Sequence, residues 1–255
     1  MLPGEEVTVI AVPNDGYFFV GWYVGEAETA VSANAFYTFI VCGDLFLKAR
    51  FERNVYNNSH TYVDLGLPSG VKWATCNVGA NAPEEYGGYY AWGETEEKQE
   101  YSINTYKWYD GSNGGVMWVV GSQGVYTKYC LDWMLGAVDN KAMLDPEDDV
   151  AHVKWGGSWR MPTISEFEEL RDECVWEDFV LNGINGCRVI GPNGDSIFLP
   201  ATGHQDVNGY YWSSSLHYFY SDCACGMDFV DSHKNPEFGF FYGRESGLCI
   251  RPVCE

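Results

Sequence analysis

Aromatic residues and glycines together constrain the fold of this chain more than any other feature of its sequence. The 255 residues include 18 Tyr, 14 Phe, 10 Trp and 29 Gly. Aromatic side chains favour the pleated surface of strands, and glycines mark turns and loops. We therefore expect short strands joined by long ordered loops rather than a bundle of long helices. A chain of this length can form one large domain, or a large domain with a small one.

The formal net charge of the chain is −21, and basic residues do not cluster anywhere in the sequence. A surface of this charge repels phosphate backbones and anionic lipid headgroups. We therefore expect no nucleic-acid partner. Because no apolar run reaches the length of a membrane span, we also expect no direct membrane insertion. The 9 cysteines are irregularly spaced and odd in number, so they form no recognisable disulfide framework and do not indicate a compartment.

Residues 1–53 show the alternation of apolar and polar residues that is typical of strands, for example at Phe18, Val20 and Trp22. We predict a small all-β domain over these residues. Three stretches, at 16–22, 37–39 and 47–52, are similar to the internalin B-type repeat. That resemblance implies a β-grasp-like spacer module of bacterial surface proteins, without chemistry of its own. The polar stretch 53–61 is the natural linker to a second domain, which we predict over 54–255.

Several local signals of secondary structure stand out in the second domain. Thr163 and Glu166 have the spacing of a capping box, and apolar residues recur after them at helical spacing, which predicts a helix. Asn182 and Gly183 predict a tight turn, and 196–200 is typical of a short buried strand. The acidic run 145–149 is typical of a solvated turn or of the start of a helix.

Five blocks of the second domain have distinctive sequences. They lie at 62–79, 89–94, 155–163, 210–215 and 244–253, and they include Trp92-Gly93, Arg160-Met161-Pro162 and Tyr211-Trp212. In this order they resemble the Fibrobacter succinogenes major paralogous domain, a family common in surface proteins of gut Bacteroidetes. The resemblance implies a C-type-lectin-like fold, in which a few helices and a small antiparallel sheet support long packed loops, and it implies no catalytic residues. The expected fold class is therefore α+β, with a C-type-lectin-like domain after a β-grasp-like all-β domain.

Some members and relatives of this family are targets of diversity-generating retroelements, which mutagenise the adenines of Asn codons. Mutation of an AAC codon can yield Tyr, His, Asp, Ser, Cys, Gly or Phe, but never Met, Trp, Lys, Gln or Glu. The residues at 217–226, at Asp228 and at 238–243 can all be reached in this way. The codon test fits a diversified surface, although any loop rich in Tyr, Phe and Gly would pass it too.

The composition of the C-terminal stretch independently favours binding. Tyrosine offers a large amphipathic contact area at little rotamer cost, while Ser, Gly, Asp and His add adaptable hydrogen bonds. We expect Trp212, Met227, Phe229 and Arg251 to belong to the buried frame. The residues between them form the predicted ligand-binding set: His217, Tyr218, Phe219, Tyr220, Asp222, Cys223, Cys225, Gly226, Asp228, Phe238, Phe240 and Tyr242.

Sharper chemistry finds less support in the sequence. His217, Cys223, Cys225 and His233 offer the ligand types that zinc prefers, but Cys-x-Cys is tighter than the usual zinc-binding spacing. The two cysteines also invite comparison with the formylglycine-generating enzymes of this fold, yet surroundings that would activate a thiolate are not recognisable. The calcium motif of lectins is missing, since 235–237 reads Asn-Pro-Glu, in the wrong order. We predict no catalytic residues, no metal and no cofactor.

The sequence therefore predicts a ligand-binding protein or adhesin, extracellular or displayed on the cell surface, and not an enzyme. Its ligand would be a protein or glycan on host or neighbouring cells. The strand-like pattern begins directly after 1–4, so we expect a signal sequence to have been removed. Two alternatives stay open: an enzyme of the formylglycine-generating type, and a structural pilus or cell-surface module without a dedicated ligand.

Overall fold

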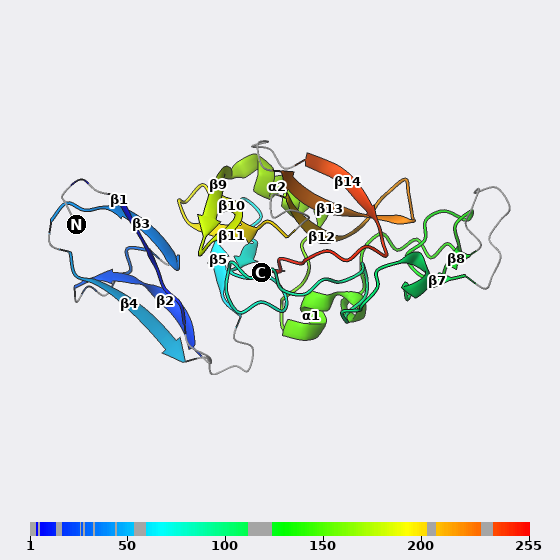
Figure 1. Ribbon diagram of the computed structural model, residues 1–255, viewed down its shortest axis with the longest axis horizontal. Coiled ribbons are helices and arrows are strands. Elements are labelled where there is room, and N and C mark those ends of the chain that lie inside the picture. Colours follow the sequence, from blue (N-terminus) through cyan, green and yellow to red (C-terminus); the bar gives the residue numbers. More distant parts are fainter. Residues whose placement is uncertain are drawn as a thin grey trace.

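The computed structural model describes residues 4, 6–13, 17–25, 27, 29–32, 34–43, 45–53, 60–111, 124–202, 208–230 and 237–255. Strands dominate these residues, which also include two short α-helices. The molecule is elongated, with the N-terminal strands at one end and the hairpin between β12 and β13 towards the other (Figure 1). These elements fit the predicted α+β class. None of the described helices has the length and apolarity needed to cross a bilayer.

The N-terminal domain consists of two antiparallel strand pairs, as its alternating sequence predicts. Its strands are β1 (Glu6–Ile10), β2 (Tyr17–Val24), β3 (Phe36–Ile40) and β4 (Leu47–Arg53), and β1 pairs with β3 while β2 pairs with β4. Trp22 and Val41 are buried, whereas Lys48 and Arg50 face solvent. Because an isolated strand pair is only marginally stable, the buried residues of the two pairs and the contact with the second domain both favour this arrangement.

Three small antiparallel sheets form the frame of the second domain. The first joins β5 (Tyr62–Asp64), β6 (Lys72–Ala74) and β15 (Val253–Cys254) in the order β15-β6-β5. The second joins β9 (Val175–Leu181), β10 (Ile184–Ile190) and β11 (Ser196–Pro200) in the order β11-β10-β9. The third joins β12 (Asn208–Leu216), β13 (Cys223–Val230) and β14 (Glu237–Gly243) in the order β12-β13-β14. A short further pair joins β7 (Tyr109–Asp110) to β8 (Val125–Tyr126).

The helical elements lie in the loops between these sheets. They are α1 (Val150–Trp155), α2 (Ile164–Glu173) and the 3₁₀ turns η1 (Ile103–Thr105) and η2 (Pro146–Asp148). The side chain of Asp149 caps α1 by accepting a hydrogen bond from His152 N at 3.0 Å. The acidic run 145–149 therefore leads into a helix, which is one of the two predicted outcomes.

The capping box predicted for α2 is confirmed. Glu166 N donates to Thr163 Oγ1 at 3.2 Å, and Thr163 N donates to the Glu166 carboxylate at 2.7 Å. Phe167 and Leu170, on the apolar stripe of the helix, are buried. Local sequence therefore specifies both the start of this helix and the face that it buries.

The tight turn predicted between two strands is also confirmed. Asn182 and Gly183 join β9 to β10 with left-handed φ angles of 49° and 86°. Two successive positive φ values suit a two-residue hairpin, and Asn and Gly tolerate them best. The strand predicted at 196–200 is β11, and each of its residues is buried.

The frame residues that the sequence predicts lie in the core of the second domain. Trp212, Met227, Phe229 and Arg251 are all buried. Met227 and Phe229 pack into the cluster beside α2, and Trp212 packs into a second cluster beside α1. The two strands β12 and β13 are therefore anchored in the core on both sides of the turn that joins them.

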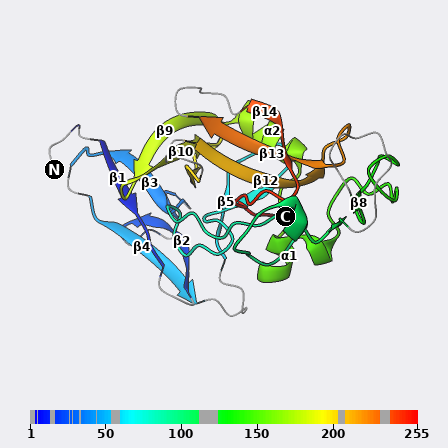
Figure 2. The ribbon, with the colours of Figure 1, turned by 45° about the vertical axis from the view of Figure 1, so that its right-hand side comes forward.

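The N-terminal domain packs against the β9–β11 sheet through buried polar contacts. Asn34 is buried, and its Nδ2 donates to the carbonyl oxygen of Ser196 at 2.8 Å and to Ser196 Oγ at 3.2 Å. Asn34 Oδ1 accepts from Phe36 N at 3.0 Å, and Arg188 Nε donates to Ser196 Oγ at 3.2 Å. Consistent with these bonds, β1 and β3 lie beside β9 and β10 (Figure 1, Figure 2). We call the contact of Asn34 with Ser196, together with the hydrogen bond from Arg188 to Ser196, the domain seam.

Candidate ligand-binding surface

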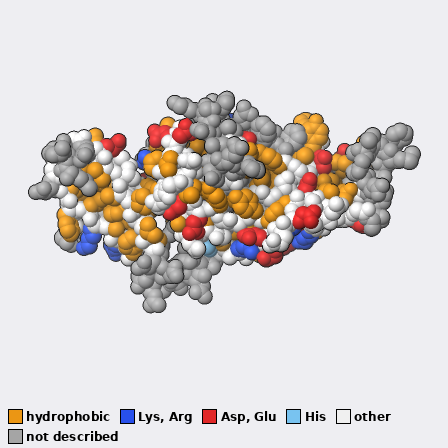
Figure 3. All heavy atoms as spheres, in the orientation of Figure 1, with side chains coloured by type: hydrophobic (Ala, Val, Ile, Leu, Met, Phe, Trp, Pro, Cys, Tyr) orange, Lys and Arg blue, Asp and Glu red, His pale blue; other side chains and the backbone are white. Residues whose placement is uncertain are grey.

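The turn that joins β12 to β13, residues 217–222, exposes three consecutive aromatic side chains. Tyr218, Phe219 and Tyr220 are 75%, 74% and 51% exposed. The turn lies on the side of the second domain that faces away from β1–β4, where hydrophobic side chains protrude from the surface (Figure 1, Figure 3). We call residues 217–222 the aromatic hairpin.

His217 organises the aromatic hairpin from within. Its Nδ1 accepts hydrogen bonds from the backbone N–H groups of Phe219 at 3.3 Å and Tyr220 at 3.1 Å. Its ring stacks on that of Tyr220, with the centroids 5.0 Å apart. Burial lowers the pKa of His217, which favours the neutral ring that can accept at Nδ1. The turn therefore holds its aromatic side chains in a defined arrangement.

Ser221 ties the aromatic hairpin to the rest of the domain. Its buried hydroxyl accepts a hydrogen bond from Leu131 N at 2.9 Å, and its carbonyl oxygen accepts one from Arg244 Nη1 at 3.0 Å. Within the hairpin, Cys223 N donates to the carbonyl oxygen of Tyr220 at 2.9 Å. The segments that contain Leu131 and Arg244, which are far apart in sequence, therefore hold the base of the turn in place.

Arg244 is fully buried at the base of the aromatic hairpin. Its guanidinium donates to Tyr106 Oη at 3.0 Å and to the carbonyl oxygens of Tyr129 and Lys128 at 3.1 and 2.9 Å. The guanidinium carbon also lies 4.6 Å from the ring centroid of Tyr126. Carbonyl oxygens and aromatic faces thus stabilise a charge that burial would otherwise disfavour.

Part of the predicted ligand-binding set lies on β13, below the aromatic hairpin. Asp222, the last residue of the hairpin, is half-buried, as are Cys223 at the start of β13 and Cys225 two residues further on. Gly226 and Asp228 are buried between β12 and β14. The expectation that Gly226 and Asp228 contact a ligand does not fit this burial, because a ligand would reach them only if the sheet opened.

The rest of the predicted set lies on β14. Tyr242 is half-buried, and its ring packs against those of Tyr210 and Trp212 with centroids 5.6 and 6.0 Å apart. It therefore supports the hairpin more than it extends the exposed surface. The strand also contains Phe238 and Phe240, but their side chains lie outside the described residues.

The thiols of Cys223 and Cys225 are shielded. Burial, together with the Asp222 carboxylate, raises the pKa of Cys223 to about 12, and burial raises the pKa of Cys225 to about 11. Both thiols therefore stay protonated at neutral pH, which is the unreactive state for a nucleophile. Of the alternative zinc ligands, His217 directs Nδ1 at the hairpin backbone, and His233 lies outside the described residues.

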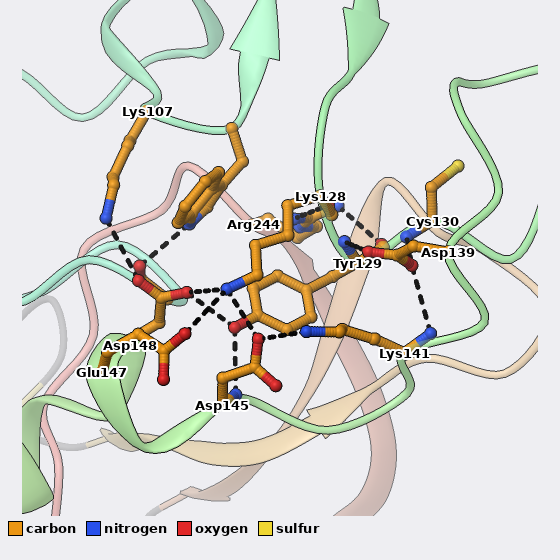
Figure 4. Close-up of polar contacts among 12 residues, drawn as sticks. Lys107, Lys128, Tyr129, Cys130, Asp139, Lys141, Asp145, Glu147, Asp148 and Arg244 are labelled. Carbon is orange, nitrogen blue, oxygen red and sulfur yellow. Dashed lines mark hydrogen bonds and ion pairs between the residues drawn. The ribbon is translucent and has the colours of Figure 1, made fainter.

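In the described part of the chain, Asp145, Glu147 and Asp148 lie close enough together to share a cation. Lys128 Nζ lies between them, at 2.7, 3.6 and 2.6 Å from their carboxylates (Figure 4). Hydrogen bonds from Lys128 and Lys141 hold the pKa of Asp145 below its ordinary value. The Lys128 ammonium therefore takes the position that a metal ion would need, and the cluster fastens the loop that contains Lys128 to η2.

One exposed aromatic side chain near the hairpin escaped the sequence-based prediction. Trp133 is 68% exposed, and Leu131, two residues before it, donates its backbone N–H to Ser221 Oγ. This hydrogen bond brings the Trp133 turn next to the base of the aromatic hairpin. Trp133 lies outside the blocks that resemble a family, and Trp cannot arise from an AAC codon. A search for large apolar residues within polar turns could have found it.

A comparison with family models identifies one part of the chain. Residues 1–55 match the model of the divergent InlB B-repeat domain, which confirms the predicted internalin-type repeat. Comparisons with curated proteins and with solved structures gave no match. Sequence similarity therefore establishes the N-terminal repeat, whereas the function of the second domain has to be argued from its own surface.

Proposed function

We propose that this chain is a ligand-binding protein, secreted or displayed on the cell surface, that recognises a protein or a glycan through the aromatic hairpin. One observation supports the proposal most strongly: Tyr218, Phe219 and Tyr220 are exposed in succession on a turn that is braced from below. Exposed aromatic patches are an aggregation liability unless they serve an interaction. Tyrosine is also frequent in binding loops, because it combines a large contact area with few rotatable bonds.

The bracing of the hairpin supports a role in binding. A loop that becomes ordered only when it binds loses affinity to conformational entropy. Here, hydrogen bonds within the chain hold the turn through His217 and its base through Ser221 and Arg244. The exposed rings add little to the stability of the core, so their role in folding does not explain this arrangement.

The finer fold assignments belong to the same proposal. Small antiparallel sheets, two short helices and long loops suit a C-type-lectin-like domain over 54–255, and the two strand pairs of 1–53 suit a β-grasp-like spacer. The match of 1–55 to the divergent InlB B-repeat supports a spacer that holds the binding domain. Diversification by a retroelement stays a prediction, which related copies that differ only at 217–226, Asp228 and 238–243, beside a matching template repeat, would bear out.

The main rival is an enzyme of the formylglycine-generating type, and the environment of its candidate nucleophiles opposes it. An active thiolate needs a neighbouring cation or base that lowers its pKa. Cys223 instead lies beside the Asp222 carboxylate, which raises its pKa further above the value that burial sets. The second rival, a structural module without a ligand, gives no reason to expose three aromatic side chains on a braced turn.

The full chain should be screened against panels of purified cell-surface proteins and glycans. The test variant is Tyr218→Ser/Phe219→Ser/Tyr220→Ser, which keeps the net charge of the chain and which we call the triple serine variant. The matched control is Phe46→Ser/Tyr62→Ser, because these side chains are 71% and 51% exposed outside the hairpin. We expect a ligand to bind the triple serine variant at least about a hundredfold more weakly, since aromatic anchors often contribute about 2 kcal/mol or more each.

Binding to the control should equal binding to the parent chain. Circular dichroism and thermal unfolding should show that the triple serine variant folds normally, because the substituted side chains are exposed. If every captured ligand binds the triple serine variant as tightly as the parent, recognition lies elsewhere and the proposal is wrong.

A further inference from the structure

We infer that the partner of the aromatic hairpin is a protein surface that presents Lys or Arg side chains beside apolar ones. This inference rests on the proposed function, because it names the class of partner for the same surface. It follows from the charges around the hairpin and from the way in which the nearby cations are already engaged.

Two carboxylates lie at the base of the aromatic hairpin. Asp222 belongs to the turn, and Glu245 directly follows Arg244, whose guanidinium binds the carbonyl oxygen of Ser221. Both side chains are partly exposed. Both carboxylates also act on the Cys223 thiol by raising its pKa, which is consistent with their lying close to the same point of the hairpin. A ligand that covers the aromatic side chains would therefore meet negative charge at their edge.

Two described cations on this side of the domain, Arg244 and Lys128, are engaged inside the protein. Arg244 is fully buried and directs its donors at carbonyl oxygens and at Tyr106 Oη. Lys128 is held by Asp145 and Asp148, with Nζ at 2.7 and 2.6 Å from their carboxylates. Neither side chain can turn towards a ligand without breaking several buried contacts. Asp222 and Glu245 are partly exposed, so an incoming partner can reach both carboxylates.

Aromatic faces and carboxylates together suit a cationic partner. Lys and Arg bind over the faces of Tyr and Phe rings, and they form charge-assisted hydrogen bonds with carboxylates. The net charge of −21 would also steer a basic partner towards the chain over a longer range. A neutral glycan can stack on the same rings, but it gains nothing from this charge. An acidic partner is repelled.

The inference can be tested with synthetic peptides of equal length and equal Leu content. In one set, four positions are Lys or Arg, in a second set Glu or Asp, and in a third set Gln or Ser. Neutral oligosaccharides form a fourth set. We expect the basic peptides to bind the full chain at least about tenfold more tightly than the other sets. Raising the NaCl concentration from about 50 to about 300 mM should weaken this binding, because salt screens exposed charges.

Variants separate a specific site from general attraction to an acidic protein. The triple serine variant keeps all charges, so it should lose the preference for basic peptides if the aromatic hairpin is the site. Asp222→Asn and Glu245→Gln should each weaken binding about three- to fivefold, as expected for a partly exposed ion pair. Glu96→Gln is the matched control, because it removes one exposed carboxylate outside the hairpin and should leave binding unchanged.

Three results would overturn the inference. Basic peptides could bind the triple serine variant as tightly as the parent, which would mean general electrostatic attraction. Neutral peptides or oligosaccharides could bind best in a hairpin-dependent way, in which case the proposed function stands and only the class of partner is wrong. The basic peptides could also fail to bind the parent chain. The proposed function itself fails only if no ligand from the wider screen depends on the aromatic hairpin.

Discussion

The domain seam and the aromatic hairpin both extend from the core of the second domain. They differ in whether their side chains are buried against other parts of the chain or exposed to solvent. At the seam, the Asn34 amide and the Ser196 hydroxyl are buried and bonded to each other. At the hairpin, the polar groups below the turn are buried and bonded, while the aromatic side chains of Tyr218, Phe219 and Tyr220 face solvent. The seam is thus a completed contact within the chain, and the hairpin is a surface prepared for another molecule.

Removal of the buried guanidinium of Arg244 should destabilise the aromatic hairpin more than any other single substitution considered below. Arg244→Met leaves the carbonyl oxygens of Lys128, Tyr129 and Ser221 without their donor. We expect a loss of about 3–5 kcal/mol in the free energy of unfolding, measured by urea denaturation, together with loss of ligand binding. A variant with the stability and affinity of the parent would show that Arg244 does not brace the hairpin.

Arg251→Met is the matched control for that experiment. Arg251 is also fully buried, but it donates to Asn77 Oδ1 at 2.8 Å and to the carbonyl oxygen of Ala74 at 3.1 Å, away from the hairpin. We expect a comparable loss of stability. At a temperature at which the control is folded, its ligand affinity should equal that of the parent.

Substitution of His217 should loosen the turn without unfolding the domain. His217→Ala removes the acceptor for the backbone N–H groups of Phe219 and Tyr220. We expect affinity to fall about tenfold, because the ordering of the aromatic side chains then has to occur on binding. His217→Asn keeps a side-chain acceptor and should restore most of the affinity. Equal affinity of the alanine variant, measured by calorimetry, would argue against pre-organisation by His217.

The seam can be broken separately. Asn34→Leu replaces the amide with an apolar side chain of similar size and removes the hydrogen bonds to Ser196. We expect a loss of about 1–3 kcal/mol in the free energy that holds the N-terminal domain in place. Small-angle scattering should then show a wider range of domain orientations, while ligand affinity stays unchanged. A variant that weakens binding as strongly as the hairpin substitutions would remove the distinction between the two surfaces.

A smaller, pH-dependent effect should arise at a third place, away from both surfaces. The His60 ring stacks on Trp155 with centroids 3.6 Å apart, and burial lowers its pKa to about 4. As the pH falls from about 6.5 towards 4, the unfolded chain takes up a proton at His60 before the folded chain does, so stability is lost over this window. His60→Phe should reduce that slope in denaturation curves. An unchanged slope would show that His60 titrates normally in the folded chain.

Features that depend on neighbouring residues could be predicted from the sequence. The Thr163–Glu166 capping box and the Asn182–Gly183 turn rest on local hydrogen bonds and local φ angles, so their sequence signals are specific. The N-terminal repeat could be predicted because its alternating strands follow a family pattern, which the match to 1–55 confirms.

The bracing of the hairpin could not be predicted in this way. Arg244 binds Tyr106 Oη and the carbonyl oxygen of Tyr129, and it packs on the Tyr126 ring. These residues lie more than a hundred positions earlier in the sequence, so no local pattern predicts the contact. Composition also could not separate Tyr218, which is exposed, from Tyr242, which packs on Trp212. Aromatic residues that an Asn codon can reach occur in both environments, so exposure depends on the strand register and the turn.

Hydrogen exchange measured by mass spectrometry, with and without a captured ligand, tests the central claim most directly. Backbone amides exchange slowly where they are hydrogen-bonded or covered, so a bound partner protects the segment that it covers. We predict new protection at 217–222, and no change at Asn34 or at Ser196. Protection confined to other segments, with exchange at 217–222 unchanged, would contradict the claim that the aromatic hairpin is the recognition surface.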